Sequence, residues 1–145
     1  MDSVFFCKWL KGFASGLDEM DAESRSRLLR HCAKQCAGTG VLQAQLRLRD
    51  AVGGNRDAFY RRLRETGNVR GEIVASGREY LIRFPDCACD LHTAGGVDTP
   101  CLCECSRQSI LYVAETVWTG CRIQVESEGT VLSGAPECRF RIRFL

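Results

Sequence analysis

The chain has 145 residues, which is the size of one ordinary domain. Hydrophobic residues make up 45% of it and charged residues 26%, a composition that permits a globular core and excludes disorder, collagen-like repeats and coiled coils. The formal net charge of +2 is too small to indicate nucleic acid or an anionic membrane as a partner. Ten cysteines stand against two histidines, so any unusual chemistry must depend mainly on sulfur.

The first half of the chain predicts four helices. Apolar residues recur every three or four positions over residues 6–17, as in an amphipathic helix. Asp21 has the chemistry of an N-cap and predicts a second helix, which the Gly-Thr-Gly run at 38–40 ends. A third helix is predicted between that run and the glycine pair at 53–54, and Asn55 is expected to cap a fourth.

The hydrophobic period changes from about 3.6 to 2 after residue 68. Two alternating runs, 69–75 and 79–84, lie on either side of Ser76-Gly77 and predict a β-hairpin. Further strands are predicted at 121–125 and 139–145. Strands joined by short connections pair antiparallel, because parallel pairing requires a long crossover.

We therefore predict a single α+β domain over residues 1–145. Residues 1–68 form its helical part, and residues 69–145 form an α+β part that contains a Cys-rich loop at 85–105. The N-terminal helices pack on an antiparallel sheet made of two hairpins, which the loop and one helix separate. That helix is predicted to begin with Ser106 as its N-cap.

The N-terminal sequence does not resemble a secretory leader, since Asp2 stands near its front and no apolar run of about 7–15 residues follows. No stretch approaches the roughly 18 apolar residues of a membrane span. We therefore expect a cytoplasmic protein with no membrane partner, whose thiols are kept reduced. In that compartment clustered cysteines favour a metal site or redox chemistry over disulfides.

Half of the cysteines lie close together in the Cys-rich loop, as Cys87-Ala-Cys89 and Cys101-Leu-Cys103-Glu-Cys105. Alternate residues of an extended backbone point the same way, so each Cys-X-Cys pair presents two sulfurs to one point. Zn²⁺ prefers four thiolate or imidazole ligands in a tetrahedral arrangement. The loop therefore predicts a zinc site formed by Cys87, Cys89, Cys103 and Cys105.

Two other interpretations of these cysteines remain open. One is a redox-active or reactive thiol, because the positive end of the following helix would lower the pKa of Cys105. The other is inert packing, since free cysteine is among the most buried residue types. The Cys-X-Cys spacing is tighter than in most structural zinc sites, and the spacings of ferredoxin clusters are absent. Cys32 and Cys36 share one helix face and, with His31 beside them, could complete a site begun by the loop. That face also carries Leu28 and Leu29, which favours core packing for them.

A cysteine-dependent enzyme is a second hypothesis. Cys105 would be the nucleophile and His92, in the same loop, the base. The glycine pair at 53–54 lacks the Lys and Ser/Thr of a phosphate loop, so nucleotide binding is not predicted. Arginines at 61–64 and 139–143 are interpreted as solvated faces, because acidic residues nearly balance them.

Three short motifs in the C-terminal half carry a resemblance. They are FPDCAC at 84–89, LCECS at 102–106 and TVLSGAPECRFRI at 130–142. Together they resemble the end of the 4-vinyl reductase-type small-molecule-binding domains, and more closely the related bacterial L-2-amino-thiazoline-4-carboxylic acid hydrolase-like family. The similarity covers residues 69–145. It implies a pocket between the sheet and the helices that binds a small hydrophobic or aromatic ligand. Some domains of the first family hold zinc through a Glu and two Cys near the last hairpin, and Cys138 matches the last of these.

We therefore predict a small-molecule-binding or sensing domain with a metal-binding Cys-rich loop, zinc being the expected metal. The alternative is a cysteine- or metal-dependent hydrolase of a small cyclic thio- or amino-acid derivative. In a metal-dependent enzyme, Cys103 and Cys105 would be metal ligands. A homodimer is a further expectation, and nucleic acid is not expected as a partner. A third hypothesis is a partner-binding subunit whose N-terminal amphipathic helix docks elsewhere, which burial of Phe6, Trp9 and Phe13 would oppose.

Overall fold

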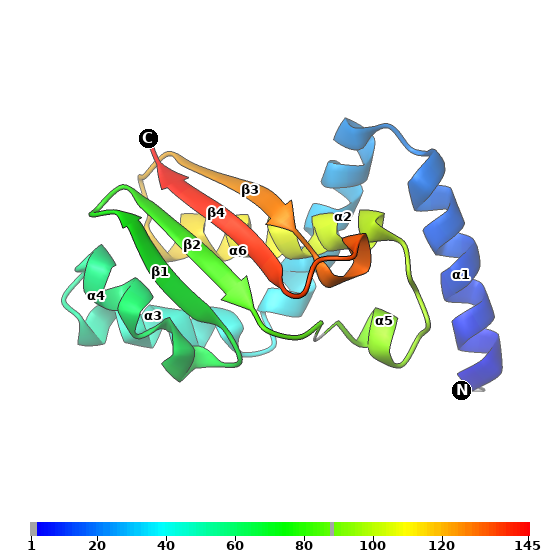
Figure 1. The fold of residues 1–145 in the computed structure, drawn as a ribbon, viewed down its shortest axis with the longest axis horizontal. Helices are drawn as coiled ribbons and strands as arrows, with labels where there is room; N and C mark the ends of the chain where they lie inside the picture. Colours follow the sequence, from blue (N-terminus) through cyan, green and yellow to red (C-terminus); the bar gives the residue numbers. More distant parts are fainter. Residues whose placement is uncertain (1–2, 88) are drawn as a thin grey trace.

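A computed structural model describes residues 3–87 and 89–145 (Figure 1). Its helices and strands are, in chain order, α1 (Ser3–Glu19), α2 (Ala22–Ala37), α3 (Val41–Ala51), α4 (Arg56–Arg61), β1 (Arg70–Ala75), β2 (Glu79–Phe84), α5 (Asp90–Thr93), α6 (Cys103–Val117), β3 (Ile123–Gly129) and β4 (Cys138–Phe144). Three short 3₁₀ turns, Leu63–Thr66, Pro100–Leu102 and Val131–Ser133, complete the secondary structure. In the part of the chain that the structure describes, no helix combines the length and hydrophobicity needed to cross a membrane.

The four strands form one antiparallel sheet in the order β1-β2-β4-β3. Each outer pair is a hairpin in sequence, and β2 and β4 join the two hairpins at the centre, where Tyr80 lies opposite Ile142. The helices α3, α4 and α6 lie on one side of this sheet, and α2 packs along α6 (Figure 1). The predicted α+β class, with helices packed on two hairpins that a Cys-rich loop and one helix separate, is confirmed.

Local capping explains where the N-terminal helices begin. The Asp21 side chain accepts a hydrogen bond from the Ser24 N–H at 2.8 Å, and Asn55 accepts one from the Ala58 N–H at 2.9 Å. Each bond satisfies a backbone donor that the first turn of a helix leaves without a partner. The predicted starts of the second and fourth helices are therefore confirmed.

The start of α6 differs from the prediction. Ser106 is not its N-cap, because the helix begins at Cys103, directly after the 3₁₀ turn Pro100–Leu102. Thr99 caps that turn by accepting a hydrogen bond from the Cys101 N–H at 3.3 Å, and Pro100 fits the first helical position. The prediction was wrong because the Thr-Pro pair, three residues before the helix, starts the helical path earlier. The loop also contains the short helix α5, and β3 runs from Ile123 instead of residue 121.

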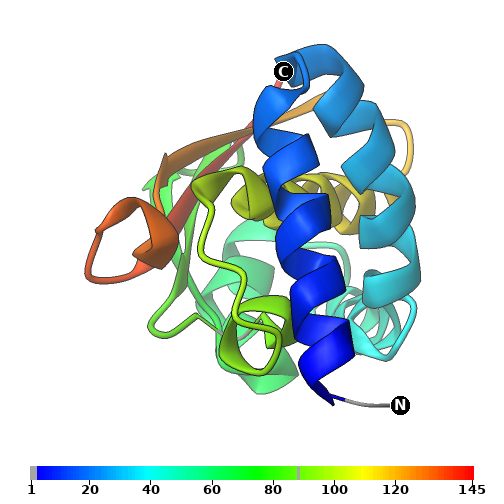
Figure 2. The same ribbon diagram turned by 90° about the vertical axis from the view of Figure 1, so that its right-hand side faces the viewer.

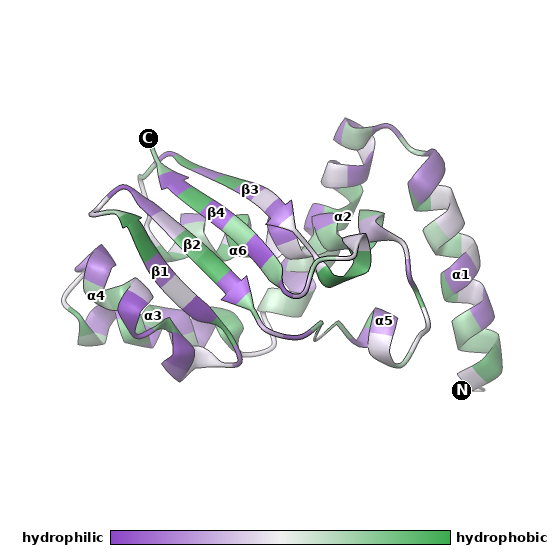
Figure 3. Ribbon diagram, in the orientation of Figure 1, coloured by the Kyte–Doolittle hydropathy of each residue, from purple (hydrophilic) through white to green (hydrophobic). Residues whose placement is uncertain are grey.

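The two faces of the sheet have different chemistry, as the alternating hydropathy of the strands shows (Figure 3). The inner face carries buried apolar side chains such as Ile82 and Phe140. The outer face carries ion pairs, with Arg141 at 2.7 Å from Glu79 and Arg143 at 2.9 Å from Glu126. The arginine run of β4 is therefore paired with glutamates of neighbouring strands.

One end of the sheet is closed by a dense aromatic group. The rings of Tyr60 and Tyr80 stack at 4.1 Å, and Phe59 meets Trp118 edge-on at 5.2 Å. Phe144 contacts this group from β4. These rings fill the space between α4, the end of α6 and the sheet.

Candidate functional site

Beyond this aromatic group, towards the other end of the sheet, the space between sheet and helices is hollow, and the ring of Tyr60 borders it. A cavity of about 360 Å³ lies there. Its floor is the inner face of β2 and β4, with Ile82 and Phe140, and α6 forms a wall with Ile110 and Val113. The size lies within the range of small-molecule pockets, about 300–1,000 Å³.

The most unusual feature of the cavity is its thiols. Six cysteines line it: Cys36, Cys87, Cys89, Cys103, Cys105 and Cys138. All four predicted zinc ligands are among them, so both Cys-X-Cys pairs border the same cavity. Every cysteine of the chain is a free thiol.

Cys36 and Cys138 reach this cavity from α2 and β4, far from the loop in sequence, and they were missing from the predicted set. For Cys138 the signal was available, because it alternates with Phe140 along β4 and so shares its inner face. Its Sγ also accepts a hydrogen bond from the Val131 N–H at 3.3 Å. For Cys36 the sequence offered a site shared with the loop as the less favoured alternative to core packing, and Cys36 does line the cavity with the loop cysteines.

Cys32 and Cys36 are exposed, so the predicted packing of both in the core is wrong. The buried side of α2 is instead the stripe Leu29, Ala33 and Ala37. Two adjacent apolar stripes run along this helix, and only one can face α6. The sequence pattern alone did not distinguish them.

Burial raises the pKa values of three of the cavity thiols, Cys89, Cys103 and Cys105. It raises the pKa of Cys105 to about 12, with smaller contributions from the neighbouring Cys32 and Cys36. Burial also raises the pKa values of Cys89 and Cys103. The predicted lowering of the Cys105 pKa by the helix start is therefore wrong, because loss of water outweighs it. At neutral pH these thiols are uncharged and form a soft, weakly polar wall.

The predicted base, His92, lies on α5 outside the set of described residues that line the cavity. Its Nδ1 is 2.8 Å from the Val97 carbonyl oxygen and 3.2 Å from Asp98 Oδ1. These contacts fold the loop back on itself after α5. The catalytic pairing of Cys105 with His92 stays a prediction.

Within residues 3–87 and 89–145, no group of three or more His, Cys, Asp or Glu side chains is arranged to hold an ion. The raised pKa values of Cys89, Cys103 and Cys105 also oppose the thiolate form that zinc requires. The zinc site of Cys87, Cys89, Cys103 and Cys105 stays a prediction.

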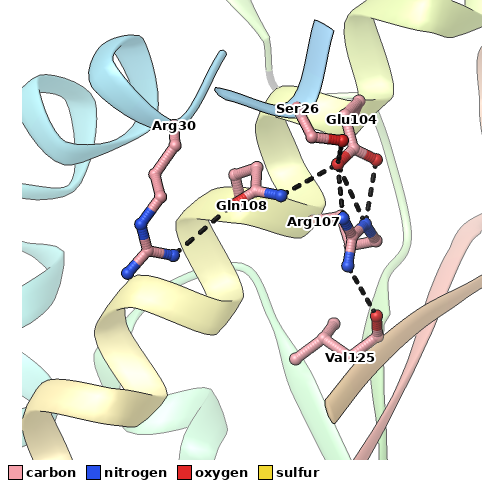
Figure 4. A network of polar contacts seen from close by, with 6 residues as sticks. All are labelled: Ser26, Arg30, Glu104, Arg107, Gln108 and Val125. Carbon is pink, nitrogen blue, oxygen red and sulfur yellow. Dashed lines mark hydrogen bonds and ion pairs between the residues drawn. The ribbon is translucent and has the colours of Figure 1, made fainter. Parts of the chain in front are cut away.

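A polar network holds the thiol-bearing turn of α6 in place (Figure 4). Glu104, between Cys103 and Cys105, accepts hydrogen bonds from Ser26 Oγ at 2.8 Å, Gln108 Nε2 at 2.9 Å and Arg107 Nη2 at 2.5 Å. The bond from Ser26 joins the start of α6 to α2, and the other two lie within α6.

The same network reaches the sheet, because Arg107 also donates to the backbone carbonyl of Val125 in β3 at 3.0 Å (Figure 4). Burial alone would raise the pKa of Glu104, but the hydrogen bonds from Arg107, Gln108 and Ser26 outweigh it and lower the pKa. Glu104 is therefore ionised at neutral pH and acts as a positioning residue for the cysteines on either side.

The polar part of the cavity wall carries almost no charge. Its polar side chains are mainly neutral: Gln45, Thr66, Asn68, Ser106 and Ser109. Of the described residues that line the cavity, none is Lys, Arg or His, and the one charged side chain is Asp86. An anionic ligand would find no counter-charge in this wall.

Comparisons with known proteins add little. No protein-family model matches the chain, and no curated protein matches it. A solved structure of a trafficking protein particle complex subunit 3 from Naegleria fowleri, covalently bound to palmitic acid, is 12% identical in sequence. The match covers 99% of this chain and 95% of that one, with a TM-score of 0.47. A likeness at this level supports no conclusion about the activity of this chain.

Proposed function

We propose that this protein binds a small, neutral and mostly apolar molecule in the cavity between the sheet and α6. The observation that carries the proposal is the cavity itself, about 360 Å³ and lined by apolar and thiol side chains. Water makes few favourable contacts with an apolar wall of this kind. A ligand of matching shape would supply such contacts.

The charge of the wall narrows the ligand class. A carboxylate buried here would meet Asp86 and no cation of the lining, at a cost of several kcal/mol. A neutral aliphatic or aromatic body meets Ile110, Val113 and Phe140 instead, and its one polar group can bond to Gln45 or Ser109. The polarizable sulfurs favour an aromatic ligand, because thiol and thioether groups pack well on rings.

The resemblance to the 4-vinyl reductase-type domains supports the same proposal. It implies a pocket between the sheet and its helices, with a small hydrophobic or aromatic ligand. The cavity lies between those elements, and the resembling motifs at 84–89, 102–106 and 130–142 contribute Cys87, Cys103 and Cys138 to its wall. We therefore propose a sensing or carrier role for the domain.

The test uses N-phenyl-1-naphthylamine, a neutral apolar fluorophore. We expect saturable binding of one probe per chain, displacement by 1-decanol, and displacement by decanoate at pH 8 that is at least about tenfold weaker. Ser109→Phe places a ring in the cavity and is expected to abolish binding. Thr119→Phe adds the same ring at an exposed position outside the cavity and serves as the control. Unsaturable binding, or equal displacement by the alcohol and the carboxylate, would contradict the proposal.

The hydrolase remains the alternative, and the position of Cys105 in the cavity wall favours it. Its pKa of about 12 opposes it, because the thiolate is the nucleophile. Ring-opening hydrolysis of an aminothiazoline carboxylate releases a thiol that can be followed directly. Turnover that Cys105→Ser abolishes would establish the enzyme and displace the binding proposal. Absence of turnover in the wild-type chain would remove the alternative.

Zinc binding by the Cys-rich loop is the metal part of this proposal. Because the pKa values of Cys89, Cys103 and Cys105 are raised, zinc must displace protons from them. We therefore expect zinc affinity to rise steeply from pH 6 to pH 8, and to fall in a Cys103→Ser, Cys105→Ser variant. Zinc affinity that does not change with pH, or that is unchanged in the variant, would show that these cysteines are not zinc ligands.

A cytoplasmic location is proposed for the chain. Ten free thiols support it, because oxidising compartments convert clustered cysteines to disulfides. Fractionation of cells that express the tagged chain would test it. Recovery in an oxidising compartment would contradict the proposal.

A further inference from the structure

The helix α1 lies at one end of the molecule and faces the viewer in Figure 2. Leu10 and Ala14 are buried in a small cluster with Val97 and Leu102 of the Cys-rich loop. Thr99 Oγ1 donates a hydrogen bond to Asp18 at 2.5 Å and fastens the same loop to the last turn of α1. The inner side of the helix is therefore accounted for by contacts within the chain.

The outer side of α1 carries a stripe that points away from the molecule. Phe5, Trp9, Gly12 and Gly16 follow one another at helical spacing, and this stripe lies opposite the buried inner side. Phe5 is 62% exposed and Trp9 57% exposed. The ring of Trp9 stacks on that of Phe13 at 5.6 Å, which fixes its direction. The first half of the stripe is therefore a large aromatic projection.

The second half of the stripe is flat. A Cβ atom built at Gly12 or at Gly16 would meet no atom within 4 Å, so both glycines face open space. Small residues on a helix surface let another helix approach its backbone closely. The outer side of α1 thus carries both protruding aromatic rings, at Phe5 and Trp9, and a flat surface that could receive them, at Gly12 and Gly16. A second copy that runs antiparallel would place Trp9 of each chain over Gly16 of the other.

The charges beside the stripe fit the same arrangement. Lys8 and Glu19 lie on the same flank, towards opposite ends of α1. A two-fold axis perpendicular to an antiparallel helix pair keeps equal flanks on the same side. Lys8 of one copy therefore lies near the end of α1 that carries Glu19 in the other copy. Because of the two-fold symmetry, this Lys8–Glu19 pair forms twice.

We propose that two copies of this chain associate through the outer stripe of α1, antiparallel, with Trp9 seated on Gly16. The contact is isologous, so it closes after two copies. An anionic lipid surface fits less well, because Asp18 and Glu19 lie on the same helix and the glycine half offers no side chain to insert.

Sedimentation of the full chain between about 1 and 100 µM tests the proposal. We expect twice the chain mass for the wild-type protein, and a dissociation constant weakened at least about tenfold by Gly16→Leu. Gly16 faces open space, so the substitution leaves the single chain unstrained. Ser15→Leu adds the same side chain beside the stripe and is the control. A wild-type monomer at the highest concentration, or equal association of all three proteins, would overturn the proposal.

Charge reversal tests the antiparallel register. Lys8→Glu and Glu19→Lys are each expected to weaken association, and the double variant to restore it, since the pair is then formed with the signs exchanged. A double variant that is weaker than both single variants would overturn the register. Binding of the wild-type chain to phosphatidylserine vesicles, without dimers in solution, would overturn the proposal in favour of a lipid surface.

Discussion

The two ends of the sheet–helix interface are built on the same strands and on α6, yet one is solid and the other hollow. At the solid end β2 presents Tyr80 and the chain after α6 presents Trp118, both in contact with aromatic rings. At the hollow end β2 presents Ile82, while α6 presents Cys105 and Ser109 to the cavity. Beyond these shared elements, α4 contributes the rings of Phe59 and Tyr60 to the solid end, whereas α2 and the Cys-rich loop contribute smaller thiol side chains to the cavity wall.

This difference indicates what each end contributes. Close packing is the ordinary condition of a protein interior, and it supplies stability where aromatic rings interlock. Small side chains that leave a space unfilled forgo those contacts. The solid end therefore carries stability and the hollow end carries the proposed binding. Substitutions at the two ends should separate these effects.

The largest effect is expected at the solid end. Phe59→Ala removes a fully buried ring from a group of rings and is expected to destabilise the fold by about 3–5 kcal/mol. Phe84→Ala, a partly exposed ring at the hollow end, is the matched control and should cost clearly less. Urea unfolding measures both. Equal losses would contradict the contrast between the two ends.

A smaller loss of stability is expected from substitutions in the polar network of Figure 4, which supports the hollow end. Glu104→Gln leaves Arg107 without its carboxylate partner and should cost about 1–3 kcal/mol. Glu115→Gln, which removes an ion pair with Arg30 at the surface, should cost within about 0.5 kcal/mol. Because the pKa of Glu104 is lowered by folding, its contribution is present above its unfolded pKa and lost as the pH falls through the folded value. A pH-independent difference between wild type and Glu104→Gln would contradict this account.

Filling the cavity should change stability little. Cys103→Leu adds volume where space exists, so we expect a change within about 1 kcal/mol and a loss of at least about tenfold in affinity for the neutral probe. Val125→Phe adds volume to the buried core outside the cavity and is expected to cost about 1–3 kcal/mol. Urea unfolding and probe titration give both values. A Cys103→Leu variant as unstable as Val125→Phe would show that the end is not hollow.

The last expected effect depends on pH and concerns the turn between β1 and β2. Asp57 accepts hydrogen bonds from Ser76 Oγ at 2.5 Å, Gly77 N–H at 2.9 Å and Tyr80 Oη at 2.6 Å, which lower its pKa to about 2. Its contribution to stability is therefore present above the unfolded pKa near 4 and is lost as the pH falls towards 2. We expect Asp57→Asn to flatten the acid side of the stability profile, measured by thermal unfolding at pH 2–7. An unchanged profile would contradict the role of Asp57.

Most features that depend on neighbouring residues were predictable from the sequence, although the N-cap predicted at Ser106 was wrong. The caps Asp21 and Asn55 and the turn at Ser76-Gly77 are each specified within a few positions, and each was found. Features that depend on packing between distant segments were not. The stripe of α2 that is buried, and the arrival of Cys36 and Cys138 at the loop, follow from how α2, α6 and β4 meet.

The chemistry of the thiols shows the same limit. From the sequence, Cys105 lies beside a helix start, and that predicts a lower pKa. In the fold it lies in an apolar wall, and burial raises the pKa to about 12. Burial depends on every segment around the cavity, so a local pattern could place the cysteines together but could not determine their charge.

Protection of the cavity thiols by a ligand tests the central claim most directly. The chain is alkylated with iodoacetamide, with and without saturating N-phenyl-1-naphthylamine, and each cysteine is quantified by peptide mass spectrometry. Cys103 and Cys138 line the cavity, whereas Cys32 is exposed outside its lining and reports general effects on reactivity. We predict that the probe slows alkylation of Cys103 and Cys138 and leaves Cys32 unchanged. Equal rates with and without probe at all three positions would contradict a ligand in this cavity.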